Sequence, residues 1–577
     1  MKIPMLRVPE TLTLGLSSLF LVVFSPFLFQ IPPVYAQKQQ VQLNNVLELA
    51  SNALPNPPTF ALPAPSLSLG GALTISVALC STSAGGGVPR VFVSNNSEVT
   101  NPASEQNAQG VYELVIGGSG VGTFVLYASS GGMLAVVPGT ETVVFDVGVS
   151  DGTDPLHELL TTLPLLGDTT SNQAIIFSPP FLPASPASPP TTYPNYTLPS
   201  AQFPFSSSLT PQAEVGGGGT SPNFTLIIGT TETFPAFDEA SGTFSSSSGG
   251  KIPASACALR SANGVVVDTT NSTSGGAGGK GTVNETIWMR DEDEGWRAQW
   301  LVEGLQPQTN YTVWVVQDGT KLAGPINIVT KSGLSFSSFP CPLVHSLPYC
   351  PLVSYASPLQ PPPIPLTAHD NTTIPANLTD PLLGYMTNFT TSLLTFACGR
   401  DWYSPLQSCE KCQSAYRTWA CAVSLPRCGE MPPSSSSDAG AGAVGASGST
   451  TQTIRPALVS QSSTSPQRNP NIAPLGTAYS VLLPCLETCN AVDRACPPFL
   501  QFTCPLPEFN ANVSYGVGYI DGDGGKRSGS WSDGGGVGVG DGTMGGGGRN
   551  GEIGVWKQGG GVTGTSMDRW GNVWCAG

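Results

Sequence analysis

The sequence has 577 residues, of which 11% are charged, against roughly 25% in ordinary globular domains. Its 68 Gly and 54 Pro make up about a fifth of the chain, which favours turns and strands over long helices. The formal net charge of −15 argues against nucleic-acid binding, because a phosphate-binding surface needs an excess of Lys and Arg.

The amino terminus predicts export into the secretory pathway. Lys2 and Arg7 precede an apolar run from Leu12 to Phe29, and Val34-Tyr35-Ala36 offers small residues suited to signal cleavage. We expect a cleaved signal peptide over residues 1–36, and the alternative is an uncleaved signal anchor because the apolar run is long.

Beyond residue 40 no apolar stretch reaches the roughly 18 to 20 residues that a spanning helix needs, so the mature chain is expected to be soluble. Membrane association would then depend on a membrane partner or on an uncleaved first segment.

Ten Asn-x-Ser/Thr sequons predict N-glycosylation of a chain that enters the secretory pathway. They lie at Asn95, Asn195, Asn223, Asn271, Asn284, Asn310, Asn371, Asn377, Asn388 and Asn512.

Two β-rich regions come next along the chain. Short β-branched and aromatic runs separated by Gly and Asn/Ser clusters predict an antiparallel β-sandwich over residues 41–165. A Pro/Ser-rich linker is expected over 166–211, and a second β domain over 212–332.

The second β domain carries two local signals. Tyr311, following Leu305-Gln306-Pro307, resembles the fibronectin type III pattern in which a Tyr opening a strand bonds back to the preceding corner, and the alternative is an ordinary hairpin. The acidic run at 290–295 suggests a metal or acid/base site, but consecutive hairpin side chains alternate in direction, so a solvated loop is the preferred interpretation.

A Pro-rich, extended linker is expected over 333–379, followed by a cysteine-rich helical module over 380–577. Its first helix is predicted to start at Asp380-Pro381, because apolar residues recur at helical spacing from Leu382 to Leu394. Fold class is therefore multidomain, with all-β sandwich-like domains preceding a disulfide-rich helical module.

The 14 cysteines are the strongest structural signal. They are Cys80, Cys257, Cys341, Cys350, Cys398, Cys409, Cys412, Cys421, Cys428, Cys485, Cys489, Cys496, Cys504 and Cys575. On a helix, Cys485, Cys489 and Cys496 would lie within about 40° of one another, so helices that present such sulfur stripes can be cross-linked.

The cysteine count constrains the tail. If Cys341 pairs with Cys350 and Cys80 with Cys257, the nine remaining clustered cysteines need Cys575 to complete them, and the tail must fold back. Alternatives are a redox Cys409-x-x-Cys412 pair or a zinc site, but an oxidising compartment and only three His favour disulfides.

The segments from Cys398 to Cys428 and from Pro484 to Cys504, with the closing Asp568 to Cys575, resemble the carboxy-terminal module of the fungal stretch-activated calcium-channel component family. A Gly-rich insert at about 521–566 departs from that pattern. The resemblance implies a Frizzled-like cysteine-rich module.

By this resemblance the chain is an extracellular auxiliary subunit that supports calcium influx by binding the outer face of a pore-forming, four-repeat calcium channel subunit. The expected location is the extracellular face of the plasma membrane or the endoplasmic reticulum. Tyr416, Arg417 and Trp419 are candidate partner contacts, since aromatic residues and Arg dominate interface energetics, with core packing of Trp419 as the alternative.

No catalytic motif such as Gly-x-Ser-x-Gly or His-Glu-x-x-His is present, so we expect neither an enzyme nor a cofactor. The competing function is a secreted or wall-associated glycoprotein or receptor whose module binds a lipid or a peptide.

Overall fold

The computed structural model describes residues 39–575, with gaps. The gaps are 67–70, 82–87, 97–98, 107, 129, 140–141, 182–221, 233–235, 239–242, 246–250, 262–264, 270–281, 292–294, 334–338, 396–406, 431–457, 507–510 and 517–574. The predicted signal peptide, the Gly-rich insert, Asn195, Asn271 and Cys398 therefore lie outside the described residues. Within the described part of the chain, no helix combines the length and apolarity needed to cross a bilayer.

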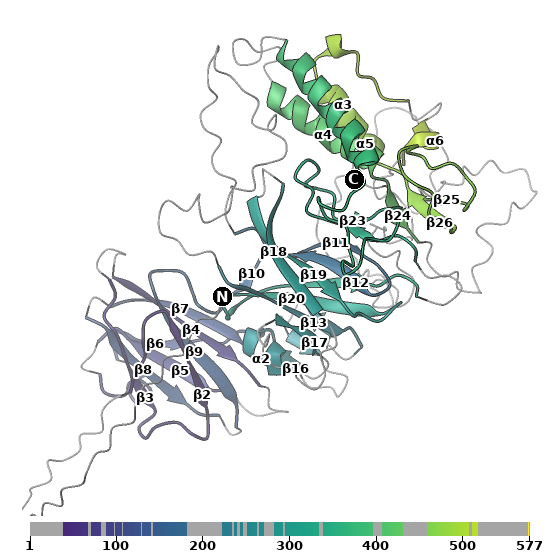
Figure 1. Cartoon of the computed structure of the whole chain (residues 1–577). Coiled ribbons are helices and arrows are strands. Elements are labelled where there is room, and N and C mark those ends of the chain that lie inside the picture. The colour runs from purple at the N-terminus through teal and green to yellow at the C-terminus, as the bar shows by residue number, and fades with distance from the viewer. Residues whose placement is uncertain are drawn as a thin grey trace, which may run out of the picture. The chain divides into compact units, whose positions relative to one another are not determined.

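The first β domain consists of two antiparallel sheets around one core (Figure 1), as the sequence predicted. Their orders are β1-β3-β8-β5-β6 and β2-β9-β4-β7. The strands are β1 (Gln39–Gln40), β2 (Asn45–Ala50), β3 (Thr59–Leu62), β4 (Ala72–Leu79), β5 (Arg90–Ser94), β6 (Val111–Leu114), β7 (Val121–Tyr127), β8 (Gly132–Val137) and β9 (Val144–Asp151). Fully buried Phe60, Ile75, Leu134 and Phe145 fill the space between the sheets.

The second β domain also has two sheets, ordered β10-β21-β20-β13-β17 and β11-β12-β19-β18, and a small sheet β14-β15-β16. The strands are β10 (Leu159–Leu160), β11 (Leu165–Thr169), β12 (Gln173–Phe177), β13 (Phe224–Thr230), β14 (Ala236–Asp238), β15 (Thr243–Ser245), β16 (Lys251–Pro253), β17 (Val265–Asp268), β18 (Thr282–Asp291), β19 (Gly295–Glu303), β20 (Asn310–Gln317) and β21 (Lys321–Val329). Trp300, Tyr311 and Val313 lie in the core that the two large sheets share.

The linker expected over 166–211 was wrong at its start, because β11 and β12 belong to the second β domain. Strand β12 pairs with β19 from Gln173↔Glu303 to Phe177↔Gln299 and is buried at every position. A strand covered on both faces lacks the apolar–polar alternation by which a half-buried strand is recognised.

Both local signals of the second domain have a structural counterpart. The backbone N–H of Gln306 donates to the Tyr311 hydroxyl at 2.7 Å, which is the predicted bond from the strand back to the corner. Strands β18 and β19 form the expected hairpin, with Asp291 paired to Gly295, whose φ of +96° suits glycine at the turn.

One disulfide joins the two β domains. Cys80, directly after β4, is bonded to Cys257 of helix α2 (Ala256–Ser261), which is the pairing that the cysteine count assumed. Beside it the Ser255 hydroxyl donates to the Leu79 carbonyl at 2.5 Å.

The segment 333–379 is not the extended linker that its prolines suggested. It contains the short paired strands β22 (Leu343–Val344) and β23 (Tyr355–Ala356), and its apolar side chains, among them Leu347 and Val353, are buried. Proline restricts the backbone but does not prevent burial when apolar side chains and disulfides tie the segment down.

The C-terminal module combines helices with a sheet of order β24-β26-β25 that the sequence did not predict. Its elements are α3 (Ala376–Leu394), α4 (Cys409–Ser424), β24 (Arg427–Gly429), β25 (Leu458–Gln461), β26 (Tyr479–Leu482), α5 (Leu486–Ala495), η4 (Pro498–Leu500) and α6 (Ala511–Ser514). Helix α3 starts four residues before the predicted Asp380, so Pro381 lies within the helix and not in its first turn.

Candidate functional site in the cysteine-rich module

Disulfides fix helices α4 and α5 to each other and to the chain around them. Cys412 of α4 bonds to Cys496 at the end of α5, with 4.6 Å between the Cα atoms. Cys489 in α5 bonds to Cys504. The predicted cross-linking of cysteine-bearing helices is therefore confirmed.

The tail folds back as the cysteine count required, because Cys575 is bonded to Cys485 at the start of α5. Cys575 is only 9% exposed and packs against Leu482 and Leu483.

The expected Cys341–Cys350 bond was wrong. Cys341 is bonded to Cys428 and Cys350 to Cys421, across sequence separations of 87 and 71 residues. Both bonds attach the Pro-rich segment to the module: Cys421 lies in α4 and Cys428 in β24. Cys341 and Cys350 do not bond to each other, because each lies beside an element that comes later in the chain: β24 for Cys341 and α4 for Cys350.

Neither alternative chemistry for the thiols matches this geometry. Cys412 bonds to α5 and not to Cys409, which is itself disulfide-bonded, so the Cys-x-x-Cys pair is not closed on itself. In the described residues, both groupings with metal-like spacing contain disulfide sulfurs, whereas a cysteine binds a metal ion as the thiolate.

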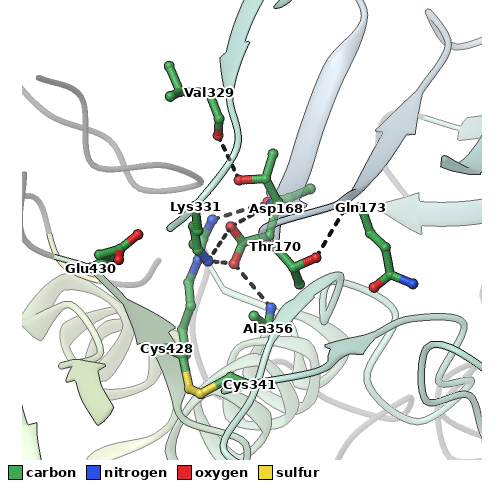
Figure 2. A network of polar contacts seen from close by, with 12 residues as sticks. Asp168, Thr170, Gln173, Val329, Lys331, Cys341, Ala356, Cys428 and Glu430 are labelled. Carbon is green, nitrogen blue, oxygen red and sulfur yellow. Dashed lines mark hydrogen bonds and ion pairs between the residues drawn. A yellow bond between two sulfur atoms is a disulfide. The ribbon is translucent and has the colours of Figure 1, made fainter. Parts of the chain in front are cut away.

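A buried charge cluster lies beside the Cys341–Cys428 bond (Figure 2). Asp168, at the end of β11, accepts from Lys331 Nζ at 3.0 Å through Oδ1 and from Arg427 Nε at 3.2 Å through Oδ2. The backbone N–H groups of Thr169 and Ala356 also donate to this carboxylate, at 2.8 and 3.1 Å. The side chains of Asp168 and Lys331 are 0% exposed.

Burial and the neighbouring charges together set the pKa of Lys331. Burial lowers the pKa of the Lys331 ammonium, Asp168 opposes that shift, and Arg427 adds to it. The ammonium also lies 4.1 Å from the centroid of the Phe339 ring. Glu430 extends the cluster by accepting from the Ser332 backbone N–H at 2.8 Å.

The cluster joins two parts of the chain. Asp168 and Lys331 come from the second β domain, whereas Arg427 and Glu430 flank Cys428 in the module. Arg427 also donates to the Gly167 carbonyl at 3.1 Å. The module is therefore attached to the second β domain by this charge cluster, and to the Pro-rich segment by the two disulfides.

Sequence reasoning missed this cluster. Asp168 fell within the expected linker, and its partners lie 163 and 259 residues away. The one local signal was that Arg427 directly precedes Cys428, because a disulfide at Cys428 also fixes the position of the neighbouring residue.

The candidate contact residues lie on α4 among aromatic neighbours. The Tyr416 ring stacks on Phe389 of α3, with centroids 3.7 Å apart, and Trp419 Nε1 donates to the Tyr515 hydroxyl at 2.8 Å. Arg417 is 5% exposed. The three side chains thus contribute to packing inside the module, and their role as partner contacts stays a prediction.

The sequons are placed as follows. Those with exposed asparagines are Asn95, Asn223, Asn284, Asn371, Asn377 and Asn388, while Asn310 is half-buried. Asn512 lies in α6, and its side chain is outside the described residues.

The Mid1 family, described as a stretch-activated Ca²⁺-permeable channel component, matches residues 73–529. No solved structure matches the chain significantly.

Three fungal proteins are similar in sequence. The stretch-activated cation channel MID1 of Cryptococcus neoformans is 34% identical over 76% of this chain and 63% of its own length. The stretch-activated cation channel MID1 of Saccharomyces cerevisiae is 28% identical over 35% of this chain and 34% of its own. The stretch-activated cation channel yam8 of Schizosaccharomyces pombe is 25% identical over 52% and 54%.

The chain thus spans less than two thirds of the length of each of these relatives. The family match nevertheless covers most of the first β domain, all of the second and most of the cysteine-rich module, including Asp168, Lys331 and Arg427. The chain belongs to the family of stretch-activated Ca²⁺-permeable channel components.

Proposed function

We propose that this chain is an extracellular auxiliary subunit of a plasma-membrane calcium channel, and that its cysteine-rich module binds the outer face of a four-repeat pore-forming subunit. Family membership supports a role in a channel. The observation that carries the proposal is the disulfide-fixed helical module, because a rigid element presents a surface without the entropic cost of ordering it on binding.

In this proposal the module has a Frizzled-like fold, and the protein is a glycoprotein that enters the secretory pathway through its amino-terminal signal. It acts without catalysis, supporting calcium influx on stretch or stress. The β domains project away from the channel, and the Asp168 cluster holds the module in a fixed position on the second β domain. The channel partner, or an uncleaved amino-terminal segment, holds the protein at the membrane.

The contact surface is best sought among exposed apolar side chains of the module. Tyr385 on α3, Val423 on α4 and Val513 on α6 are 60%, 41% and 68% exposed. They contribute less to the module's own packing than Tyr416 and Trp419, so their replacement tests binding with less risk of unfolding.

The test is isolation of the tagged protein from detergent-solubilised membranes of its native host. We expect a polypeptide of four repeated six-helix units to co-purify, and at least one of Tyr385→Ala, Val423→Ser and Val513→Ser to reduce its recovery at equal surface abundance. Calcium influx should be lost on deletion of the gene and restored by the wild-type chain. Release into the medium or wall, without a channel polypeptide, would instead support the lipid- or peptide-binding glycoprotein.

A further inference from the structure

A cavity of about 170 Å³ lies at the amino-terminal end of α3. Three segments form its lining, namely 359–363, 369–378 and 471–473. This volume is below the roughly 300 to 1,000 Å³ of pockets that hold drug-sized ligands, and it suits a single sugar ring.

The lining is largely apolar, with polar groups at defined points. Pro361, Pro363, Pro375 and Ile472 supply apolar surface of the kind that covers the C–H face of a sugar. Buried His369 also lines the cavity, but both its ring nitrogens are engaged, Nδ1 with Thr373 Oγ1 at 3.1 Å and Nε2 with the Gln360 carbonyl at 2.8 Å. The imidazole is therefore committed to the fold and not to a metal ion.

Asn377 places a glycan attachment atom in this lining. The residue is exposed, begins the sequon Asn377-Leu378-Thr379 and lies in the first turn of α3. Its Nδ2 donates one hydrogen to the Asn471 carbonyl at 2.8 Å. A primary amide carries two N–H bonds, so glycosylation of Nδ2 can replace one hydrogen and leave the bond to Asn471 intact.

We propose that Asn377 is N-glycosylated and that its first N-acetylglucosamine occupies this cavity, joining segments 359–363 and 471–473 to the start of α3. The glycan comes from a lipid-diphosphate-linked oligosaccharide: the anomeric C–O bond to the diphosphate breaks, the C–N bond to Asn377 Nδ2 forms, and Nδ2 loses a proton. The lipid diphosphate is the leaving group.

Asn388 provides a matched comparison on the same helix. It is exposed, begins a sequon, and lies eleven residues after Asn377, which is about 20° around the helix. It does not line the cavity. A glycan at Asn388 therefore projects from the same side of α3 but not into this cavity.

The test uses the full-length protein purified from a host that adds high-mannose glycans, and glycopeptide mass spectrometry first measures occupancy. Thr379→Ala removes the sequon while keeping the Asn377 amide, and Thr379→Ser keeps the sequon. Asn388→Gln is the control, because Thr390 of that sequon is buried and bonded to Gln413. Endoglycosidase H, which leaves one N-acetylglucosamine on each asparagine, separates the first sugar from the rest.

We expect Thr379→Ala to lower the Tm by about 2 to 4 °C, and to increase amide hydrogen exchange in 471–473. Thr379→Ser, Asn388→Gln and endoglycosidase H treatment should leave both unchanged. An unoccupied Asn377, an unchanged Tm for Thr379→Ala, or an equal fall after endoglycosidase H would overturn the proposal. This proposal rests on entry into the secretory pathway, which is part of the proposed function. None of these outcomes bears on channel binding, which is tested separately.

Discussion

Asp168 and Lys331 lie 163 positions apart in the sequence and form an ion pair, 3.0 Å from Oδ1 to Nζ, from which solvent is excluded. Arg427 occupies the second carboxylate oxygen from β24, 259 positions from Asp168. Three distant parts of the chain thus depend on one carboxylate, so the second β domain and the module are expected to unfold together.

Asp168→Asn should destabilise the protein by about 3 to 5 kcal/mol, because it leaves the buried Lys331 and the partly buried Arg427 without their shared anion. Lys331→Met should cost less, since Asp168 keeps Arg427 and two backbone donors. Denaturant unfolding with the disulfides intact measures both. Glu113→Gln is the control, because it breaks the exposed Arg90–Glu113 pair and should change stability little. Equal stability of Asp168→Asn and wild type would contradict a structural role of the cluster.

Removing the Cys350–Cys421 bond should destabilise the module by about 2 to 5 kcal/mol, because the bond closes a long loop between the Pro-rich segment and α4. The double variant Cys350→Ser/Cys421→Ser avoids an unpaired thiol and should be secreted in lower amounts. Limited proteolysis should then cut within 351–375 in the variant and not in wild type. The absence of new cleavage there would show that burial alone holds the segment.

Tyr311→Phe should cost about 1 kcal/mol, because it removes the acceptor for the Gln306 backbone N–H while leaving the ring in the core. Tyr112→Phe, at a tyrosine that is 44% exposed, is the matched control. Thermal unfolding of the two variants beside wild type gives the difference. If both variants unfold at the same temperature, the corner bond contributes nothing measurable.

Stability between pH 4 and 7 should reflect two opposed groups in the first β domain. Burial, with a smaller contribution from Glu48, raises the pKa of Asp146 to about 6, so its contribution is present at low pH and is lost as pH rises through about 6. Burial lowers the pKa of His157 to about 4, so its contribution is present above about 6.5 and is lost as pH falls through about 4.

Asp146→Asn removes the contribution of Asp146 alone. At pH 7 the variant should be more stable than wild type by about 1 kcal/mol, after allowance for partial exposure of Asp146, and this advantage should vanish near pH 4. Thermal unfolding from pH 4 to 8 measures it. A difference that is constant across this range would mean that Asp146 does not titrate in the folded protein.

The sequence predicted those features whose signals are local or countable. Tyr311 lies near the start of a strand, and its hydrogen-bond partner Gln306 lies in the corner just before it. The bond could therefore be predicted from the six residues 306–311. The return of Cys575 was predicted by counting cysteines, although one premise of the count, the Cys341–Cys350 bond, was wrong. Cys341 and Cys350 each take one clustered cysteine, so the number left is still odd and still needs Cys575.

What could not be predicted depends on distant partners. Cys341 and Cys350 are close in sequence, yet each bonds to a cysteine more than seventy residues further on. Asp168 looks like an ordinary polar residue between strands, and nothing near it indicates Lys331 or Arg427. Strand β12 carries no alternation because both its faces are covered.

The bond between Cys485 and Cys575 closes a covalent ring, since the two cysteines are 90 positions apart along the chain. A protease that cuts the backbone once between them opens the ring but releases no fragment. Such a nicked protein would migrate as one species on a non-reducing gel and separate into two only after reduction. Cleavage in this region would therefore pass unnoticed on any gel run with the disulfides intact, and the nicked protein would still carry the Cys575 end at the start of α5.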